Sequence, residues 1–222
     1  MPSTQEKLKA IKRSFRLYMN GVVSASMRQK GADYKINWGV SLEHLREMSQ
    51  EYGKDEELAD ALWKENIREC KILATLIMPS SAMNAEKAEE WLNDIRTQEM
   101  AELTAYHLFQ YMDGATQMAI SWLDKDQPLQ RICAFHVLSN QFKQSVQMNE
   151  QDEARFLQYV LRSLKSSYMS ERHAAMNALN HFADIDDVHD KQAQDLLEKW
   201  ETEMTENNDN LSWITTRMLC YR

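Results

Sequence analysis

The sequence predicts an all-α protein in which antiparallel helix pairs stack one on another. Glycine and proline, the residues that most often interrupt helices, number only 5 and 3 among 222 residues. Strong helix formers such as Leu, Ala, Met, Glu, Gln and Lys are abundant, and no segment alternates β-branched with polar residues as a strand would. A repeated segment in the second half of the chain indicates how the helices are arranged.

The repeat consists of two similar helical segments, LQRICAFHVL and SERHAAMNAL. Each carries an arginine ahead of an alanine that would let a neighbouring helix approach closely: Arg131 before Ala134, and Arg172 before Ala175. The two arginines are 41 residues apart, about the length of one HEAT or armadillo repeat. One such unit cannot bury its own apolar face. The sequence therefore predicts a HEAT/ARM-like α-α superhelix.

The individual helices follow from apolar residues at helical spacing and from the residues that cap them. Ser41 and Asp55 are good N-caps, Pro79 ends a helix, Asp113 begins a turn, and Pro128 suits a first helical turn. In order, the expected helices cover residues 4–19, 22–30, 42–52, 58–78, 85–95, 99–112, 118–123, 129–138, 156–164, 172–182, 193–204 and 211–221. No linker is long enough to separate two domains, so we expect residues 1–222 to form a single HEAT-like repeat domain.

Charge is distributed unevenly along the chain. The formal net charge is −8, yet residues 1–36 carry eight basic and two acidic side chains, which leaves −14 for the remainder. An acidic protein can still bind DNA through a local basic groove, because phosphate contacts depend on local charge. Charge alone favours the alternative to DNA binding, which is a solvated acidic surface together with a basic N-terminal helix.

Nothing in the sequence predicts a membrane anchor, a metal site or a cofactor. The longest largely apolar stretch, 72–78, is too short to span a bilayer. The three cysteines are widely separated, which argues against a metal-binding CxxC motif and suits a reducing cytoplasm, where we expect the protein. His181, Asp184 and His189 come nearest to a metal cluster, but they flank an acidic loop, and we expect solvated or capping roles instead.

Tryptophan positions bear on whether bases could stack on this protein. Trp63, Trp91 and Trp200 fall on apolar stripes and are expected in the core. Trp38 falls in a loop, where an aromatic side chain can be a stacking platform but more often anchors the loop.

Several segments resemble the AlkD-type DNA alkylation repair family. Residues 27–30 and 38–46 are similar to the opening of that family, 58–63 and 69–74 to its next repeat, and 129–134 to a later one. The resemblance spans nearly the whole chain in the order and spacing of helices. It implies a HEAT-like superhelix whose concave face holds duplex DNA. In active members it also implies hydrolysis of the N-glycosidic bond of N3- or N7-alkylated purines, without a metal or cofactor.

The resemblance also assigns site positions. Active members place a Trp and, four residues later, an Asp on one helix, and these positions hold Gln98 and Glu102 here. The carboxylate of Glu102 implies a catalytic role in stabilising an oxocarbenium-like sugar or positioning water. A second family Trp falls at Asn177. Without both tryptophans the chain lacks a cation–π surface for a positively charged base, worth about 1–2 kcal/mol.

Phosphate contacts are expected from three cations. The family's phosphate-binding arginine corresponds to Arg131, and Arg172 and Lys165 are further candidates. The alternative for Arg131 is an ion pair with Glu102 across a repeat joint.

The sequence thus predicts a protein that binds duplex DNA, and it leaves open whether alkylated purines are excised. The rival is a non-catalytic repeat scaffold for a protein partner, which the acidic balance and the missing tryptophans favour. A basic groove around Arg131 would favour DNA.

Overall fold

The computed structural model describes residues 2–32 and 34–206. Within them the chain is helical, with two short 3₁₀ turns and no strand, which confirms the all-α superhelix. The expected helix over 211–221 lies outside the described residues. In chain order the elements are α1 (Thr4–Ser14), α2 (Gly21–Gln29), α3 (Leu42–Tyr52), α4 (Glu56–Trp63), α5 (Arg68–Ile77), η1 (Ser80–Ala82), α6 (Ala85–Asn93), α7 (Gln98–His107), η2 (Phe109–Tyr111), α8 (Ala115–Trp122), α9 (Pro128–Lys143), α10 (Glu150–Leu164), α11 (Met169–Ala183) and α12 (Asp187–Glu206).

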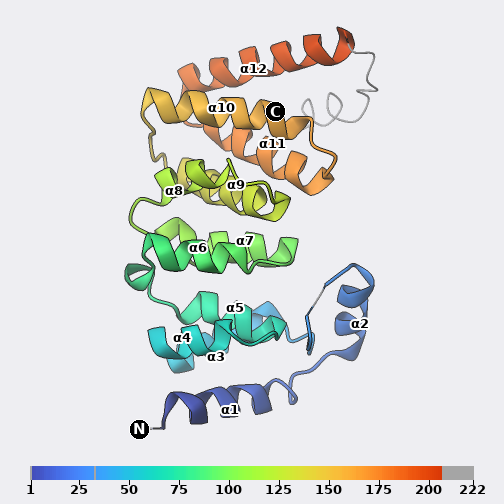
Figure 1. Cartoon of the computed structure of the whole chain (residues 1–222), viewed down its shortest axis with the longest axis vertical. Coiled ribbons are helices and arrows are strands. Elements are labelled where there is room, and N and C mark those ends of the chain that lie inside the picture. The colour runs from blue at the N-terminus through green and yellow to red at the C-terminus, as the bar shows by residue number, and fades with distance from the viewer. Residues whose placement is uncertain (1, 33, 207–222) are drawn as a thin grey trace.

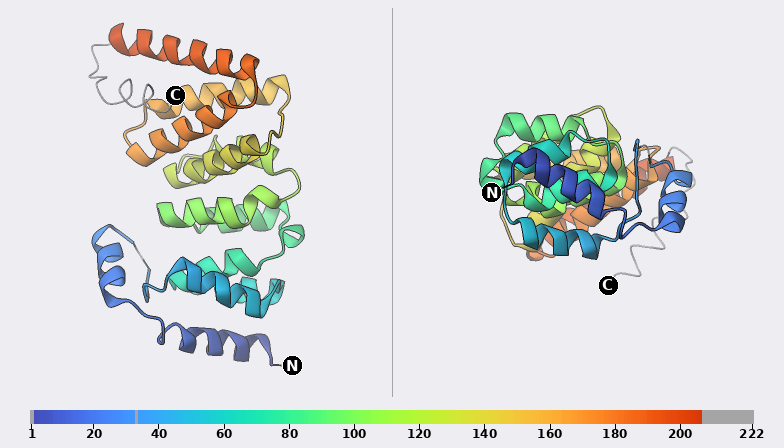
Figure 2. Two further views of the ribbon diagram at one scale, coloured as in Figure 1. Left: turned by 180° about the vertical axis from the view of Figure 1, so that it is seen from behind. Right: turned by 90° about the horizontal axis from the view of Figure 1, so that it is seen from below.

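The helices form successive tiers along one axis, from α1 at one end to α12 at the other (Figure 1). Four helices, α5, α7, α9 and α11, contact one another in that order, and we call them the central stack. Helix α3 and helix α4 pack on α5, α8 packs on α9, and α10 and α12 pack on α11. The α2 helix stands apart from the tiers, beside the ends of α3 and α5 (Figures 1 and 2).

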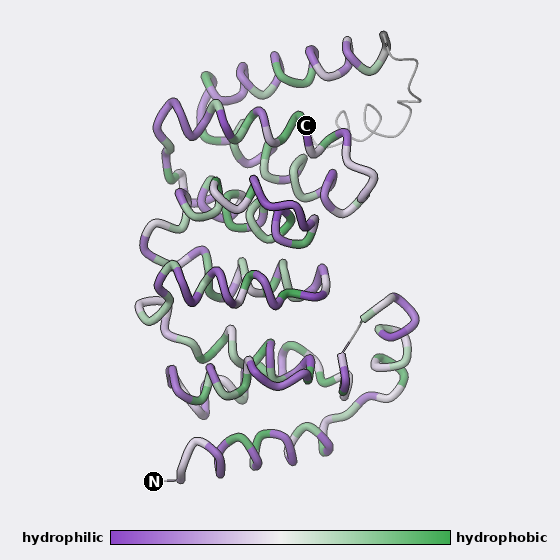
Figure 3. The backbone as a smooth tube through the Cα atoms, viewed as in Figure 1, coloured by the Kyte–Doolittle hydropathy of each residue, from purple (hydrophilic) through white to green (hydrophobic). Residues whose placement is uncertain are grey.

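Apolar side chains explain why the tiers stack. Along the tube in Figure 3, hydrophobic and hydrophilic residues alternate within each helix, as expected of helices with one buried face. Ala134 on α9 and Ala175 on α11 are fully buried, and these two helices pack against each other. Beyond them the rings of Phe142, Phe156 and Phe182 contact one another edge-on or tilted and join α9, α10 and α11.

Several predicted helices end earlier than the sequence indicates. The helix expected over 4–19 stops at Ser14, and the helix expected over 85–95 stops at Asn93. The helix expected over 99–112 ends at His107 and is followed by the 3₁₀ turn η2. The helix predicted over 58–78 is divided in two, because Ile67 is extended and lies beside Ile36 in an isolated parallel bridge. The amide of Ile36 donates to Asn66 O at 3.3 Å, and the amide of Arg68 donates to Ile36 O at 3.2 Å. This long-range pairing outweighs the helical preference of the intervening residues.

No helix among residues 2–32 and 34–206 is long and apolar enough to cross a membrane.

Candidate nucleic-acid interface

Three helices of the central stack leave polar side chains accessible along one side. Residues three or four apart lie on the same face of a helix, so each helix contributes a short row. We call these rows together the polar stripe: Gln98, Glu102 and Tyr106 on α7, His136, Asn140 and Lys143 on α9, and His173, Asn177 and Asn180 on α11. By contrast, every α5 side chain but Leu76 is buried, in part under α3.

Glu102 lies at the centre of a small polar cluster on the stripe. Gln98 Nε2 donates to Glu102 Oε1 at 2.7 Å, and His136 Nε2 lies 3.8 Å from the same oxygen. Burial lowers the pKa of His136, Glu102 counteracts this, and the nearby Lys143 lowers that pKa further. At neutral pH the imidazole is therefore uncharged. The structure brings together the two family positions, 98 and 102, and adds a histidine that sequence reasoning missed.

Arg131 is buried at the joint between α9 and α11. Its Nε and Nη2 donate to the two carboxylate oxygens of Glu171 at 2.7 and 2.8 Å, which makes a bidentate ion pair. Its Nη1 donates to the carbonyls of Lys125 and Asp126 at 2.7 and 2.8 Å. Four of the five guanidinium N–H groups are thus used, and one on Nη2 remains. The alternative considered for Arg131, an ion pair with Glu102, is wrong in its partner, because the carboxylate that Arg131 binds is that of Glu171 on α11.

Glu171 is as completely engaged as its partner. Ser163 Oγ and Ser166 Oγ donate to the carboxylate at 2.9 and 2.8 Å, besides the two bonds from Arg131. Burial pushes the pKa of Glu171 upward, but these hydrogen bonds together outweigh it and hold the pKa below its ordinary value. The carboxylate therefore stays ionised and neutralises Arg131 within the protein.

The same arrangement occurs two joints earlier in the central stack, between α5 and α7. Arg68 Nε and Nη2 donate to the two oxygens of Glu99 at 2.7 and 2.6 Å, and Nη1 donates to Val40 O at 3.1 Å. Two of the joints in the central stack are thus closed by an arginine on one helix and a glutamate in the first turn of the next. The sequence signal, an Arg and a Glu 31 or 40 residues apart, is too loose to find alone.

Arg172 and Lys165 lie near the same end of the stack. Arg172 is half-buried, and its Nη1 donates to the carbonyl of Ser166. Lys165 is more exposed and pairs with Glu203 of α12. A surface ion pair of this kind contributes little to stability and can be exchanged for a phosphate. Phosphate contacts by Arg131, Arg172 and Lys165 stay predictions.

Asn177 is the residue that the resemblance leads us to expect at the second family Trp position. Its Nδ2 donates to Ser139 Oγ at 2.9 Å, which links α11 to α9. Trp63, Trp91 and Trp200 lie in the core as predicted, with the rings of Trp63 and Trp91 stacked at 4.1 Å between centroids.

The described residues contain no group of three or more side chains suited to bind a metal ion. His181 lies 3.4 Å from Asp184, whereas His189 bonds elsewhere, to Asp186 at 2.6 Å and Glu153 at 3.4 Å. His181 and Asp184 thus pair with each other, and His189 pairs with two other carboxylates.

Comparison with known proteins bears on these features. Residues 11–145 match the family model described as DNA alkylation repair enzyme. A solved structure matches with a TM-score of 0.76 and 15% identity, over 86% of this chain and 82% of that one. It is described as a new family of proteins related to the HEAT-like repeat DNA glycosylases with affinity for branched DNA structures. No curated protein matches. The family match covers more than half of the chain, which therefore belongs to the DNA alkylation repair enzyme family.

Proposed function

We propose that this protein binds DNA in a repair-related role and recognises the shape of the DNA in preference to an alkylated base. The observation that carries the proposal is the polar stripe at Gln98 and Asn177. Both are amides in hydrogen bonds with neighbouring side chains, Glu102 and Ser139, where the resemblance to glycosylases leads us to expect tryptophans. Amides can bind sugar and phosphate oxygens, but they present no aromatic face to a cationic base.

Family membership and the fold support the same reading. The chain belongs to a repair family, and its structural neighbour is described as having affinity for branched DNA structures. We extend that affinity to this chain as part of the proposal.

The phosphate contacts that we propose come from the accessible cations along the stack. Lys143 is exposed on the stripe, Lys165 can leave its surface pair with Glu203, and the half-buried Arg172 directly precedes His173 of the stripe. Arg131 adds a single free N–H, so its contribution is to hold the joint and to offer one hydrogen bond.

Base excision is the second candidate, and Glu102 favours it. Its carboxylate lies on the stripe at the family's acidic position, with 40% of the side chain exposed. There it could stabilise positive charge on a deoxyribose as the base leaves. The substrate would then be a base whose glycosidic bond breaks without cation–π stabilisation from a neighbouring tryptophan.

The test is one titration series with the purified protein. Linear duplex, alkylated duplex and a three-way junction of equal length are titrated at two salt concentrations, and released bases are assayed in parallel. We expect salt-sensitive binding, tighter for the junction, without base release. Release that disappears in Glu102→Gln would establish the glycosylase instead. If no DNA binds even at low salt, the proposal fails and the protein-binding scaffold becomes the better reading.

A further inference from the structure

Apolar side chains are exposed where α1 ends and α2 begins. Leu17 is 79% exposed, Tyr18 49%, Met19 58% and Val22 82%. We call residues 16–23 the α1–α2 corner. Single exposed apolar residues are ordinary on a protein surface, but a contiguous run of this kind indicates a binding site.

The corner is rigidly mounted on the rest of the molecule. The amide of Asn20 donates to Trp38 O at 2.8 Å, and Ser24 Oγ donates to Asn37 O at 2.6 Å. The segment that receives these bonds is itself fixed, because the buried carboxylate of Glu69 accepts the amide hydrogens of residues 38–40. The backbone that carries the exposed side chains is therefore anchored to residues 37 and 38 by hydrogen bonds.

Basic side chains flank the corner along the chain, and Lys35 lines the pocket beside it together with Met19 and Gly21. Arg13, Arg16, Lys30 and Lys35 are exposed and form no ion pair among the described residues. The sequence from residue 2 to residue 32 contains a single acidic side chain, Glu6. The polar stripe, in contrast, carries one lysine and loses the charge of Arg131 to Glu171. The accessible cations of the N-terminal region thus complement a polyanion.

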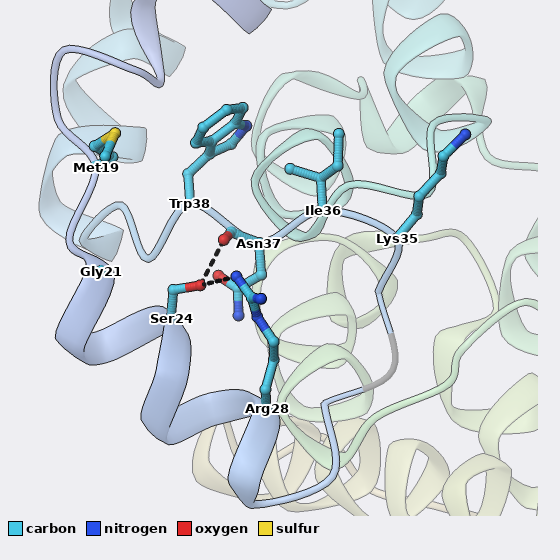
Figure 4. Close-up of a pocket in the computed structure, with 8 residues that line it drawn as sticks. All are labelled: Met19, Gly21, Ser24, Arg28, Lys35, Ile36, Asn37 and Trp38. Carbon is cyan, nitrogen blue, oxygen red and sulfur yellow. Dashed lines mark hydrogen bonds between the residues drawn. The ribbon is translucent and has the colours of Figure 1, made fainter.

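Two ring contacts lie in and beside the corner, and in the first the Tyr18 and His44 rings are tilted by 37° to each other. The Tyr18 ring lies against the His44 imidazole, with 3.4 Å between centroids, and half of the tyrosine remains exposed. The Arg16 guanidinium lies 5.7 Å from the Trp38 ring centroid. Next to them a pocket of about 260 Å³ is lined by both polar and apolar groups, including Arg28 and Lys35 (Figure 4). The tyrosine thus contacts His44 and still exposes about half of its surface, on which a base could stack.

We infer that the α1–α2 corner is a second DNA contact, which stacks an unpaired nucleotide of branched DNA on Tyr18 and its aliphatic neighbours. Arg13, Arg16 and Lys35 would bind the flanking phosphates. The inference rests on the proposed function and deepens it, since it names the surface that recognises the branch point of the DNA. Base faces inside a duplex are covered by their neighbours, whereas a branch point exposes them to an apolar or aromatic side chain. A surface that read duplex phosphates alone would need the cations and not the apolar residues.

The experiment measures affinity by fluorescence anisotropy for a three-way junction and a linear duplex of the same length. The junction carries 2-aminopurine at the branch, and stacking on the protein changes its fluorescence. We expect Tyr18→Ala to weaken junction binding about tenfold, to leave duplex binding nearly unchanged, and to remove the fluorescence change. Leu17→Ser should act in the same direction. The matched control is Tyr111→Ala, because Tyr111 is 57% exposed and lies outside the corner.

Three results would overturn the inference in distinguishable ways. An unchanged ratio of junction to duplex affinity in both Tyr18→Ala and Leu17→Ser removes the corner from branch recognition and leaves the proposed function standing. Binding of the wild type to anionic phospholipid vesicles, lost in Leu17→Ser while junction affinity is kept, would make the corner a membrane contact. Failure of the wild type to bind either DNA at low salt would remove the proposed function and this inference together.

Discussion

At two joints of the central stack an arginine forms a bidentate ion pair with a glutamate on the next helix of the stack. The guanidinium groups of Arg68 and Arg131 are buried, and each also donates to backbone carbonyls. Removing one member of such a pair leaves an uncompensated charge in a poorly solvated place. These arginines therefore hold the superhelix together, whatever else they contact.

Arg131→Ala should lower the free energy of unfolding by about 3–5 kcal/mol, because Glu171 would stay buried without its charge partner. Urea unfolding followed by circular dichroism measures the loss. Arg131→Lys keeps the charge without the planar fork and should recover part of it. A loss below about 1 kcal/mol would mean that the pair behaves like a surface ion pair.

The phosphate contact predicted for Arg131 has its own readout. Where the alanine variant is still folded, the plot of log affinity against log salt should flatten by about one unit. An unchanged slope would exclude Arg131 from phosphate binding while leaving its role at the joint untouched.

His107 makes stability depend on pH. Burial, followed by the charges of Arg46 and Lys54, lowers the pKa of His107 to about 4, and its Nδ1 lies 3.2 Å from Thr75 Oγ1. Below its ordinary pKa of about 6.5 the unfolded chain takes up this proton more readily than the folded one. Stability should therefore fall by roughly 2 kcal/mol between pH 6.5 and 4, with the partial exposure of the ring discounted, and level off below. His107→Gln should flatten this part of the curve, and an identical curve would refute the assignment.

Among the elements, α2 depends most on a single backbone position. Gly39 has φ +69°, and a Cβ there would overlap the carbonyl oxygen of Asn20 and the amide of Ser24. A glycine is thus required twice, for its backbone conformation and for the close approach of α2.

Gly39→Ala should loosen α2 as well as destabilise the protein. Gly53 provides the control, because its φ is +65° and a Cβ there would meet nothing within 4 Å. Both variants should lose about 1–3 kcal/mol to backbone strain, and only Gly39→Ala should lose about 1–3 kcal/mol more to the clash. Hydrogen exchange of residues 21–29 should rise in Gly39→Ala alone. Equal behaviour of the two variants would show that α2 is not held by this contact.

Helix periodicity predicts most elements here, because each helix buries one apolar face whatever its neighbours are. It fails where a distant segment decides the conformation, as at Ile67, which the bridge to Ile36 holds extended. In the site, too, contacts within one helix can be predicted from the sequence, and contacts between helices cannot. Gln98 and Glu102 are one turn apart on α7 and could be paired from the sequence, whereas His136 joins them only across two helices. The partner of Arg131 was missed because several glutamates are equally plausible from the sequence.

At the scale of the whole molecule, each tier contacts mainly the tiers beside it. Stability in such a chain is a sum over neighbouring interfaces, so damage at one joint should stay near that joint. The organisation of residues 1–222 as a single domain stays a prediction. If damage at one joint stays local, the tiers of that domain unfold partly independently.

Glu171→Gln and Glu99→Gln test how far damage at a joint spreads. The first weakens the joint between α9 and α11, and hydrogen exchange should increase mostly in α10, α11 and α12. The second weakens the joint between α5 and α7 and should expose the N-terminal tiers instead. A uniform increase over the whole chain in both variants would indicate one cooperative unit.

The N-terminal end of the superhelix carries the excess of cations, whereas acidic side chains outnumber the two lysines of α12 at the other end. A molecule charged in this way has a permanent electric dipole along its long axis. The field of an approaching polyanion exerts a torque on this dipole, which turns the basic α1 end toward the polyanion before any contact forms. An approaching polyanion would then meet the α1 end of the superhelix first.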